Sequence, residues 1–397
     1  MKKTICAILI LALAAISFVG CTKNSTPATS QSSPTVQPTA ESTAVAADTT
    51  EPAVTEDAVV ETAVPEPDPN AYDREALKKE FLALADEVTV NEDSVTFTDA
   101  SGAESITIKK NPQKVFNLYA SFTTLWYEAG GVAAGVIGGS SSVETYKTYI
   151  GRDISSDEGI EILATSSSGS KWSPETIIAG QPDLIICSTA MSGYKTIAAP
   201  AAAANIPVIA VNYNSFSDYL KWFKVFCNLT GHSELWDSVA MKALDEVLDV
   251  LTEIPTSNNP TAFIMFTAAG KQLQANTEGT VVGEMVKIMR AENIVYNPAL
   301  DENGAERVDI NLESVFAAQP DVIMVQCHGT KEDAMAQVQE EFGEVETWKN
   351  LEAVKNGKVY YLDKLFFHNK PNSRFAEAYQ ILAEILYPEV NFSFKNK

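Results

Sequence analysis

The chain has 397 residues and a formal net charge of −23 at pH 7, because 52 acidic residues outnumber 29 lysines and arginines. This balance argues against nucleic acid and anionic lipid surfaces as partners. Cysteine is sparse, and Cys187, Cys227 and Cys327 in the body of the chain lack metal-ligand spacing. Neither a disulfide framework nor a cysteine-rich metal site is therefore expected.

The N-terminus has the layout of an export signal. Met1–Lys3 is basic, Ile5–Val19 is apolar but short for a membrane span, and Gly20 then precedes Cys21. Residues 1–20 resemble a bacterial lipoprotein signal peptide, although a phenylalanine stands where leucine is usual. The resemblance implies that Cys21 becomes the first mature residue and carries a lipid that anchors the protein, outside the cytoplasm, to the cell membrane. The alternative is an ordinary secretory signal with an incidental cysteine.

The next segment, residues 21–70, is predicted to be a disordered tether. From Thr22 to Asn70 it is rich in Ser, Thr, Pro, Ala, Val and acidic residues and contains no aromatic residue. Such a composition buries too little apolar area to offset the entropy of ordering. As a flexible coil it would span about 40 Å root-mean-square. A glycosylated stalk is the alternative and would have the same topology.

The body begins with a helix and a hairpin. Asp73–Val88 places its apolar residues on one helical face, and Ser94–Ile108 alternates about an Asp-Ala-Ser-Gly turn. Alternating strands and helices follow as far as residue 232. In this stretch we expect Tyr119–Thr123 to be a loop before a helix at Thr124–Ala129, and the serines after Gly139 to form a loop.

A long helix is predicted midway along the body. Residues 233–255 carry one apolar stripe, with Val239, Leu244 and Leu251 among its members, and Pro255 marks its end. At about twenty residues it would be about 30 Å long. We expect it to join an N-terminal lobe at 71–232 to a C-terminal lobe at 256–397.

One phrase occurs in both lobes. Ser173–Cys187 and Asn311–Val325 each contain a glutamate, a short amphipathic turn, Gln-Pro-Asp and a wholly apolar run. Proline ends the helix, and the apolar run is typical of a strand covered on both faces of a parallel sheet. The repeat predicts two similar α/β lobes facing each other across a cleft. The alternative is chance recurrence of a common α/β phrase.

Several motifs carry a resemblance to a known family. They are Val95–Gly102 with Asn111–Val115, Gly283–Val286 with Ala291–Asn293, and Trp348 with Leu351–Tyr360. In this order and spacing they resemble the iron–siderophore substrate-binding proteins of ABC importers, a group that also includes cobalamin and haem binders. The resemblance covers about Ser94 to Pro388. It implies an α/β fold of two Rossmann-like lobes joined by a single long helix, the class III periplasmic-binding-protein fold, with a ligand cleft between the lobes.

The resemblance also implies partners. In the family, one glutamate per lobe pairs with arginines of the membrane permease, and Glu175 and Glu313 occupy those places here. The expected partners are a permease dimer with its cytoplasmic ATPase, a small metal chelate and, through the lipid anchor, the membrane; the protein is expected to be a monomer. Such exposed charges would set orientation and on-rate more than affinity. The alternative role of each glutamate is to favour its helix N-terminus.

Loops after the strands should line the cleft. Tyrosine and tryptophan suit the flat faces of a chelate, and arginine and lysine suit its negative charge. About half of the candidates are expected to touch ligand. The candidates are Tyr119, Ser121, Tyr146, Lys171, Trp172, Thr189, Tyr194, Tyr213, Gln272, Arg307, His328, Lys364, His368 and Arg374.

The histidines leave one alternative open. His328 or His368 could ligate the metal of haem or a corrin, but a loop histidine more often only makes hydrogen bonds. His232 is expected to be solvated. No metal site of the protein's own, no resident cofactor and no catalytic residue are predicted.

The chain is therefore interpreted as a binding protein that delivers a ferric siderophore or similar chelate to an importer. Haem and cobalamin remain as alternative ligands. A non-transport receptor and a metal-cluster enzyme on a two-lobed fold are the alternatives of a different class, and the absence of a nucleophile–His–Asp set disfavours the enzyme.

Overall fold

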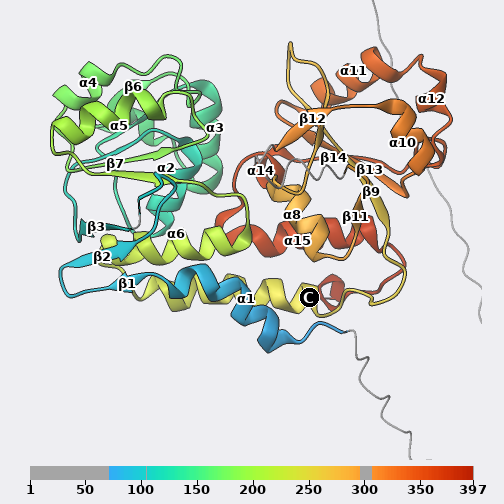
Figure 1. Cartoon of the computed structure of the whole chain (residues 1–397), viewed down its shortest axis with the longest axis horizontal. Helices are drawn as coiled ribbons and strands as arrows, with labels where there is room; N and C mark the ends of the chain where they lie inside the picture. The colour runs from blue at the N-terminus through green and yellow to red at the C-terminus, as the bar shows by residue number, and fades with distance from the viewer. Residues whose placement is uncertain (1–70, 104, 296–305, 397) are drawn as a thin grey trace, which may run out of the picture. The chain divides into compact units, whose positions relative to one another are not determined.

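In the computed structural model, the two larger β-sheets, each with its own helices, lie above a shared layer of helices (Figure 1). The structure describes residues 71–103, 105–295 and 306–396, all of which belong to one compact unit, 65–397. The predicted signal peptide, Cys21 and the tether lie outside the described residues. Within the described part of the chain, no helix is long and apolar enough to cross a membrane.

The N-terminal lobe contains a five-stranded sheet in which every strand pair is parallel, in the order β6-β5-β4-β7-β8. Its strands are β4 (Val115–Asn117), β5 (Gly135–Ile137), β6 (Glu161–Ala164), β7 (Leu184–Ser188) and β8 (Val208–Val211). Its helices are α2 (Ala120–Glu128), α3 (Ser140–Tyr149), α4 (Pro174–Ala179) and α5 (Tyr194–Ala203), with a 3-10 turn at Ile154–Ser156. All of β7 is buried, which confirms the strand predicted from its apolar run.

Two predictions for this lobe were wrong. Tyr119–Thr123 is not a loop, because α2 begins at Ala120 with Tyr119 as its extended N-cap residue. The serines after Gly139 begin helix α3 and do not form a loop. In both cases the helix starts at small or hydroxyl residues that read locally as loop, and packing of the following apolar residues decides the outcome.

The C-terminal lobe has a mixed sheet. Its strand order is β12-β10-β9-β13-β14, and β10 runs antiparallel to both of its neighbours while β11 pairs in parallel with β9. The strands are β9 (Thr261–Thr267), β10 (Gln274–Asn276), β11 (Glu292–Asn293), β12 (Arg307–Asp309), β13 (Val322–Cys327) and β14 (Val359–Leu362). The helices are α8 (Val281–Ile288), α10 (Leu312–Ala318), α11 (Lys331–Phe342), α12 (Glu346–Lys349), α13 (Glu352–Lys355) and α14 (Lys364–Phe367), followed by 3-10 turns at Asn372–Arg374 and Ser393–Asn396.

A layer of helices underlies both sheets in Figure 1. It contains α1 (Arg74–Asp86), α6 (Phe216–Leu229), a π-helical segment at Trp236–Met241 that runs into α7 (Lys242–Leu251), and α15 (Phe375–Leu386). The predicted first helix is thus confirmed as α1, and the predicted hairpin as β2 (Ser94–Phe97) and β3 (Ile106–Lys109), which β1 (Thr89–Val90) extends to three strands. Gly231, with φ +81°, follows the end of α6 in the left-handed conformation that glycine adopts without strain.

One hydrophobic core ties the lobes together through this layer. Phe375 of α15 packs against Tyr213, Phe216 and Tyr219, with ring centroids 5.0–6.2 Å apart. Phe81 of α1 packs edge-on against Phe216 at 5.2 Å. Residues from β4, α2, α6, α7, α8, β9 and α15 belong to the same buried cluster. Because this core is continuous, relative movement of the lobes would have to break aromatic contacts.

The repeated phrase has a structural explanation. In each copy the glutamine adopts a left-handed conformation (φ 49° at Gln181 and 45° at Gln319), and a strand follows the proline and aspartate. Asp183 accepts hydrogen bonds from the backbone N–H groups of Gln113 and Lys114, both at 2.9 Å, where β4 is about to begin.

The second aspartate makes equivalent hydrogen bonds in the C-terminal lobe. Asp321 accepts bonds from the N–H and the hydroxyl of Thr261, both at 2.8 Å, at the first residue of β9. Each aspartate therefore fastens the central strand of its sheet to the neighbouring strand. This shared role explains why the phrase occurs once in each lobe.

Candidate functional site

A cavity of about 150 Å³ lies between the lobes at the carboxyl ends of both sheets. The last residue of β7, Ser188, and the residues just after β8 form its N-terminal wall, and Gln326 of β13 lies on the C-terminal wall. Ligands of parallel sheets bind at this edge. The cavity is smaller than the 300–1,000 Å³ or so of whole small-molecule pockets, so it fits part of a ligand.

The N-terminal wall is aromatic and uncharged. Tyr119, Phe122 and Tyr213 line it, together with the amides Asn212 and Asn214 that flank Tyr213. Burial, followed by the charge of Glu306, raises the pKa of Tyr119, so its phenol is neutral. This wall offers flat apolar faces and hydrogen-bonding amides.

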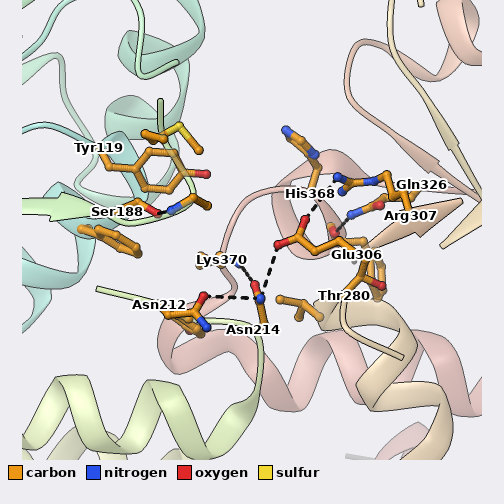
Figure 2. Close-up of a pocket in the computed structure, with 16 residues that line it drawn as sticks. Tyr119, Ser188, Asn212, Asn214, Thr280, Glu306, Arg307, Gln326, His368 and Lys370 are labelled. Atoms are coloured by element: carbon orange, nitrogen blue, oxygen red, sulfur yellow. Dashed lines mark hydrogen bonds and ion pairs between the residues drawn. The ribbon is translucent and has the colours of Figure 1, made fainter. Parts of the chain in front are cut away.

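The C-terminal wall carries the charges. Glu306, Arg307, His368 and Lys370 line it (Figure 2). The Arg307 guanidinium donates to Asn276 Oδ1 at 3.1 Å and to Glu306 Oε2 at 3.2 Å, and it lies 4.0 Å from the centre of the Phe266 ring. Burial lowers the pKa of Arg307 from its ordinary value, while Glu306 opposes the shift.

Two predicted histidines touch each other at this side of the cavity, although only His368 lines it. The rings of His328 and His368 have centroids 4.5 Å apart, and His368 stacks on Phe266 at 5.7 Å. Burial first, and then His328, lowers the pKa of His368 to about 3, so its imidazole is neutral at physiological pH. Its Nδ1 is buried and has no hydrogen-bond partner among the described residues.

A segment that we call the strap, residues 364–374, connects the C-terminal lobe to the other lobe. Lys370 Nζ donates to Asn214 Oδ1 at 3.1 Å, and Asn372 Nδ2 donates to Thr124 Oγ1 at 3.1 Å. The backbone N–H and the hydroxyl of Ser373 both donate to Glu128 Oε1. The strap thus holds part of the C-terminal wall against α2.

Further strap contacts involve predicted residues. Lys364 forms an ion pair with Glu144 of α3, and the Tyr149 hydroxyl donates to the Leu365 carbonyl. Arg374 instead forms a bidentate ion pair with Glu377, at 2.7 Å for both bonds. Lys364 and Arg374 therefore already have partners without a ligand.

The structure brings four of the fourteen predicted ligand residues to the cavity wall. These are Tyr119, Tyr213, Arg307 and His368. His328 lies behind His368 and lines an adjoining groove of about 480 Å³ between the β9–β10 turn and α11. Lys171, Thr189, Tyr194, Gln272, Lys364 and Arg374 do not line the cavity.

Three predicted residues are buried elsewhere. Ser121 lies inside α2 and is 5% exposed. Tyr146 is fully buried and donates to the Ile137 carbonyl at 2.8 Å, and Trp172 donates its indole N–H to the Ser166 carbonyl at 3.2 Å while packing in the N-terminal lobe. The polar groups of Tyr146 and Trp172 are thus satisfied within the N-terminal lobe.

Sequence reasoning missed several wall residues. They are Phe122, Ser188, Ala190, Met191, Asn212, Asn214, Thr280, Val281, Glu306, Gln326, Phe367 and Lys370. A signal existed for some of them: Asn212 and Asn214 flank the predicted Tyr213, and Lys370 stands two residues from the predicted His368. The position of Thr280 could not be read locally, because it enters the cavity as the N-cap residue of α8.

The two glutamates of the repeat occupy matched places. Glu175 and Glu313 are exposed and lie in the first turns of α4 and α10, two residues after the N-cap residues Ser173 and Asn311. Figure 1 shows α4 and α10 on the outward sides of the two lobes. Neither carboxylate forms an ion pair with another described residue.

No cluster of three or more metal-ligating side chains occurs among the described residues. All three body cysteines are buried and unpaired, as the sequence predicted. The site therefore has the properties of a binding cleft, with aromatic faces on one wall and charged groups on the other.

Comparisons with known proteins agree with this description. The model of the family described as "Periplasmic binding protein" matches residues 119–365, more than half of the chain. The chain therefore belongs to the periplasmic binding protein family, a family of substrate-binding proteins and not of enzymes.

Individual relatives are similar over most or part of the chain. The uncharacterized ABC transporter substrate-binding lipoprotein YvrC of Bacillus subtilis is 27% identical over 299 residues, which cover 74% of this chain and 86% of YvrC. The high-affinity heme uptake system protein IsdE of Staphylococcus aureus is 27% identical over 136 residues, which cover 34% of this chain and 44% of IsdE.

Solved structures support the fold. Staphylococcus aureus SirA complexed with staphyloferrin B aligns with a TM-score of 0.56 at 18% identity, covering 73% of this chain and 98% of SirA. Staphylococcus aureus IsdE complexed with heme aligns with a TM-score of 0.54 at 18% identity, covering 70% of this chain and 99% of IsdE. The predicted class III fold of two lobes joined by a helix is confirmed.

Proposed function

We propose that this protein is the extracytoplasmic, lipid-anchored substrate-binding component of an ABC importer, and that its cleft captures a ferric siderophore or a similar metal chelate. The observation that carries the proposal is the cavity at the carboxyl ends of both sheets, which combines tyrosine faces with Arg307 and Lys370. Aromatic faces suit a chelate, and cations suit its negative charge. The resemblance to YvrC, described as a substrate-binding lipoprotein of an ABC transporter, supports the transport role.

Delivery would use the two exposed glutamates. Glu175 and Glu313 stand at equivalent places of the repeated phrase, so they can present two similar carboxylates to a two-fold symmetric permease dimer. The lipid would be carried by Cys21. The proposed binding of a chelate in the cleft does not depend on which permease Glu175 and Glu313 contact.

Haem is the second candidate ligand, and one observation favours it. His368 Nδ1 is buried, neutral and without a partner among the described residues, and Met191 lies on the opposite wall of the same cavity. A neutral imidazole and a thioether are both iron ligands in haem proteins. SirA and IsdE, which share this fold, were solved with staphyloferrin B and with heme, which illustrates both ligand types.

The test is a tryptophan-fluorescence titration of the full chain with ferric siderophores, haem, cobalamin and free metal ions. We expect saturable quenching by one ferric chelate or by haem, with a dissociation constant of about 1 μM or tighter, equivalent to roughly −8 kcal/mol. Binding of haem with a Soret shift that His368→Ala abolishes would assign the second candidate. If no member of the panel binds, the receptor proposal is wrong.

A further inference from the structure

Lys370 is a cation of the cleft that has no counter-ion among the described residues. Its only hydrogen bond in the described part of the chain goes to Asn214 Oδ1, at 3.1 Å, and no carboxylate lies within ion-pair distance there. The ammonium also lies 5.3 Å from the centre of the Tyr213 ring. An ammonium has three hydrogens to donate, so two remain for a ligand.

Arg307 is the second cation of the wall, and it too has a donor group without a partner among the described residues. Its Nε and Nη1 donate to Asn276 and Glu306, but Nη2 donates to no described residue. Glu306, the one carboxylate among the described wall residues, already accepts from Arg307 and from Asn214 Nδ2 at 3.3 Å. The described part of the wall therefore holds two positive charges and one negative charge that is already engaged.

These residues form one continuous hydrogen-bond network across the cleft. Figure 2 shows Lys370, Asn214, Glu306 and Arg307 linked in sequence around the cavity. Asn214 comes from the N-terminal lobe and the other three come from the C-terminal lobe, so both lobes fix the position of the cations. A preorganised pair of donors loses little entropy when it binds an anion.

Burial makes the charge of Lys370 unfavourable. Burial is the main cause that lowers its pKa to about 8, with Glu306 and Asp218 opposing and Arg307 adding to the shift. A partly desolvated ammonium without a counter-ion gains from any anion that reaches it. The protein as a whole carries a net charge of −23, so a cationic pocket is a local feature of this wall and not a general property of its surface.

Size restricts which anion can enter. A cavity of about 150 Å³ admits an appendage of a ligand, whereas a whole chelate needs several hundred Å³. A carboxylate arm is small and planar, has two oxygens for two cations, and pairs well with guanidinium. A catecholate or hydroxamate group differs, because its oxygens are occupied by the metal at the centre of the chelate.

We propose that Lys370 and Arg307 form a carboxylate-binding subsite, so that the ligand is an iron chelate with a free carboxylate arm. The inference rests on the proposed function and narrows its ligand class. Two sources supply this chemistry: a hydroxycarboxylate complex such as ferric citrate, and the propionate groups of haem. The body of the chelate would lie outside the inner cavity, against the tyrosines.

The test compares ligands that carry a free carboxylate with ligands that lack one. The full chain is titrated with haem and with haem dimethyl ester, and separately with ferric citrate and with a carboxylate-free ferric hydroxamate. We expect haem or ferric citrate to bind at least tenfold more tightly than its carboxylate-free counterpart. Tight binding of haem assigns the propionate source, and tight binding of ferric citrate assigns the hydroxycarboxylate source.

Variants link the effect to the subsite. Lys370→Met should weaken binding of the carboxylate ligand at least tenfold and leave the ester or hydroxamate unchanged, and Lys370→Arg should restore most of the loss. Lys355→Met removes an exposed lysine of the same lobe and serves as the control, with circular dichroism to check folding of each variant. Arg307→Gln gives a second reading should Lys370→Met fail to fold.

The outcomes separate the two proposals. If a carboxylate-free chelate binds as tightly as its partner, or if Lys370→Met weakens both equally, the subsite is wrong while the receptor function stands. If none of these four ligands binds but another ferric siderophore of the wider panel does, the subsite is likewise wrong and the receptor function stands. If no member of the wider panel binds, both proposals fail.

Discussion

The two lobes are built on the same phrase but line the cleft with different chemistry. Each has a capped helix, a left-handed glutamine and an aspartate that fastens the central strand of its sheet. The N-terminal wall nevertheless presents tyrosines and amides, whereas the C-terminal wall presents Glu306, Arg307, His368 and Lys370. The repeated phrase therefore specifies the scaffold, and the residues that distinguish the two walls lie outside it.

The two sheets also differ in the direction of their strands. The N-terminal sheet is wholly parallel, so its cleft edge consists of strand ends and short loops. In the C-terminal sheet, β10 runs antiparallel to both β9 and β12, and Arg307 is the first residue of β12. The antiparallel edge therefore brings a charged strand residue to a position that has no equivalent in the other lobe.

The largest effect is expected from the feature that the lobes share. Replacing both Glu175 and Glu313 by arginine should abolish uptake, because two repelling charges would meet the permease, while ligand affinity stays unchanged. Uptake of radiolabelled iron chelate in cells and titration of the purified protein measure the two quantities.

The pair Glu92→Arg and Glu389→Arg gives the matched control, since it makes the same charge change at exposed sites away from α4 and α10. Single reversals test the symmetry of the lobes: equal losses support equivalent docking, and a loss confined to one glutamate contradicts it. Normal uptake by the double variant would refute the docking role.

The next effect concerns the core that joins the lobes. Phe375→Ala removes a fully buried ring of α15 that packs against Tyr213 and Phe216, and should cost about 3–5 kcal/mol of unfolding free energy. We expect one cooperative transition in calorimetry, shifted to lower temperature as a whole. Two separated transitions, with only one of them shifted, would show that the lobes unfold independently.

The free energy of unfolding should depend on pH through Glu128, which accepts hydrogen bonds from Ser373 of the strap. Burial raises the pKa of Glu128 to about 7, although Ser373 donates to it, and its Oε2 has no partner among the described residues. The charge of Glu128 also acts on the buried phenols of Tyr213 and Tyr219. Because the folded state holds this proton more tightly than the unfolded state, stability is highest below about pH 4.5 for this group and falls as pH rises through 7.

Glu128→Gln should remove that dependence and gain up to about 3 kcal/mol at pH 8, since one pKa unit corresponds to about 1.4 kcal/mol. Denaturant unfolding at pH 5, 6, 7 and 8 measures it. The other lobe offers a comparison: burial raises the pKa of Glu284 on α8 to about 8, so Glu284→Gln should act in the same direction. An unchanged pH slope in Glu128→Gln would contradict the assignment.

The smallest effect tests the repeat itself. Asp183→Ala and Asp321→Ala each remove an exposed carboxylate that accepts two hydrogen bonds, and each should cost roughly 1–2 kcal/mol. Urea unfolding at one pH compares them. Similar losses would show that the two copies do equal structural work, and a negligible loss in either would restrict the role to one lobe.

Much of the scaffold could be read from the sequence. The apolar runs of β7 and β13 and the amphipathic face of α1 are local patterns, and local patterns are set by period and propensity. The site was less accessible. Tyr119, Tyr213, Arg307 and His368 were predicted to lie in loops at the cleft and do line the cavity, but Tyr146 and Trp172 were predicted on the same grounds and are buried in the N-terminal lobe.

The sequence by itself determined the two-lobed α/β plan, the helix that joins the lobes and the matched glutamates, because periodicity, proline placement and an internal repeat are written along the chain. The tertiary structure alone decided that α2 begins already at Ala120, that α3 replaces an expected loop, that Lys370 contacts Asn214, and that Glu306 pairs with Arg307. The physical reason is that these contacts join residues from different elements and lobes, or depend on burial that only the packed fold provides.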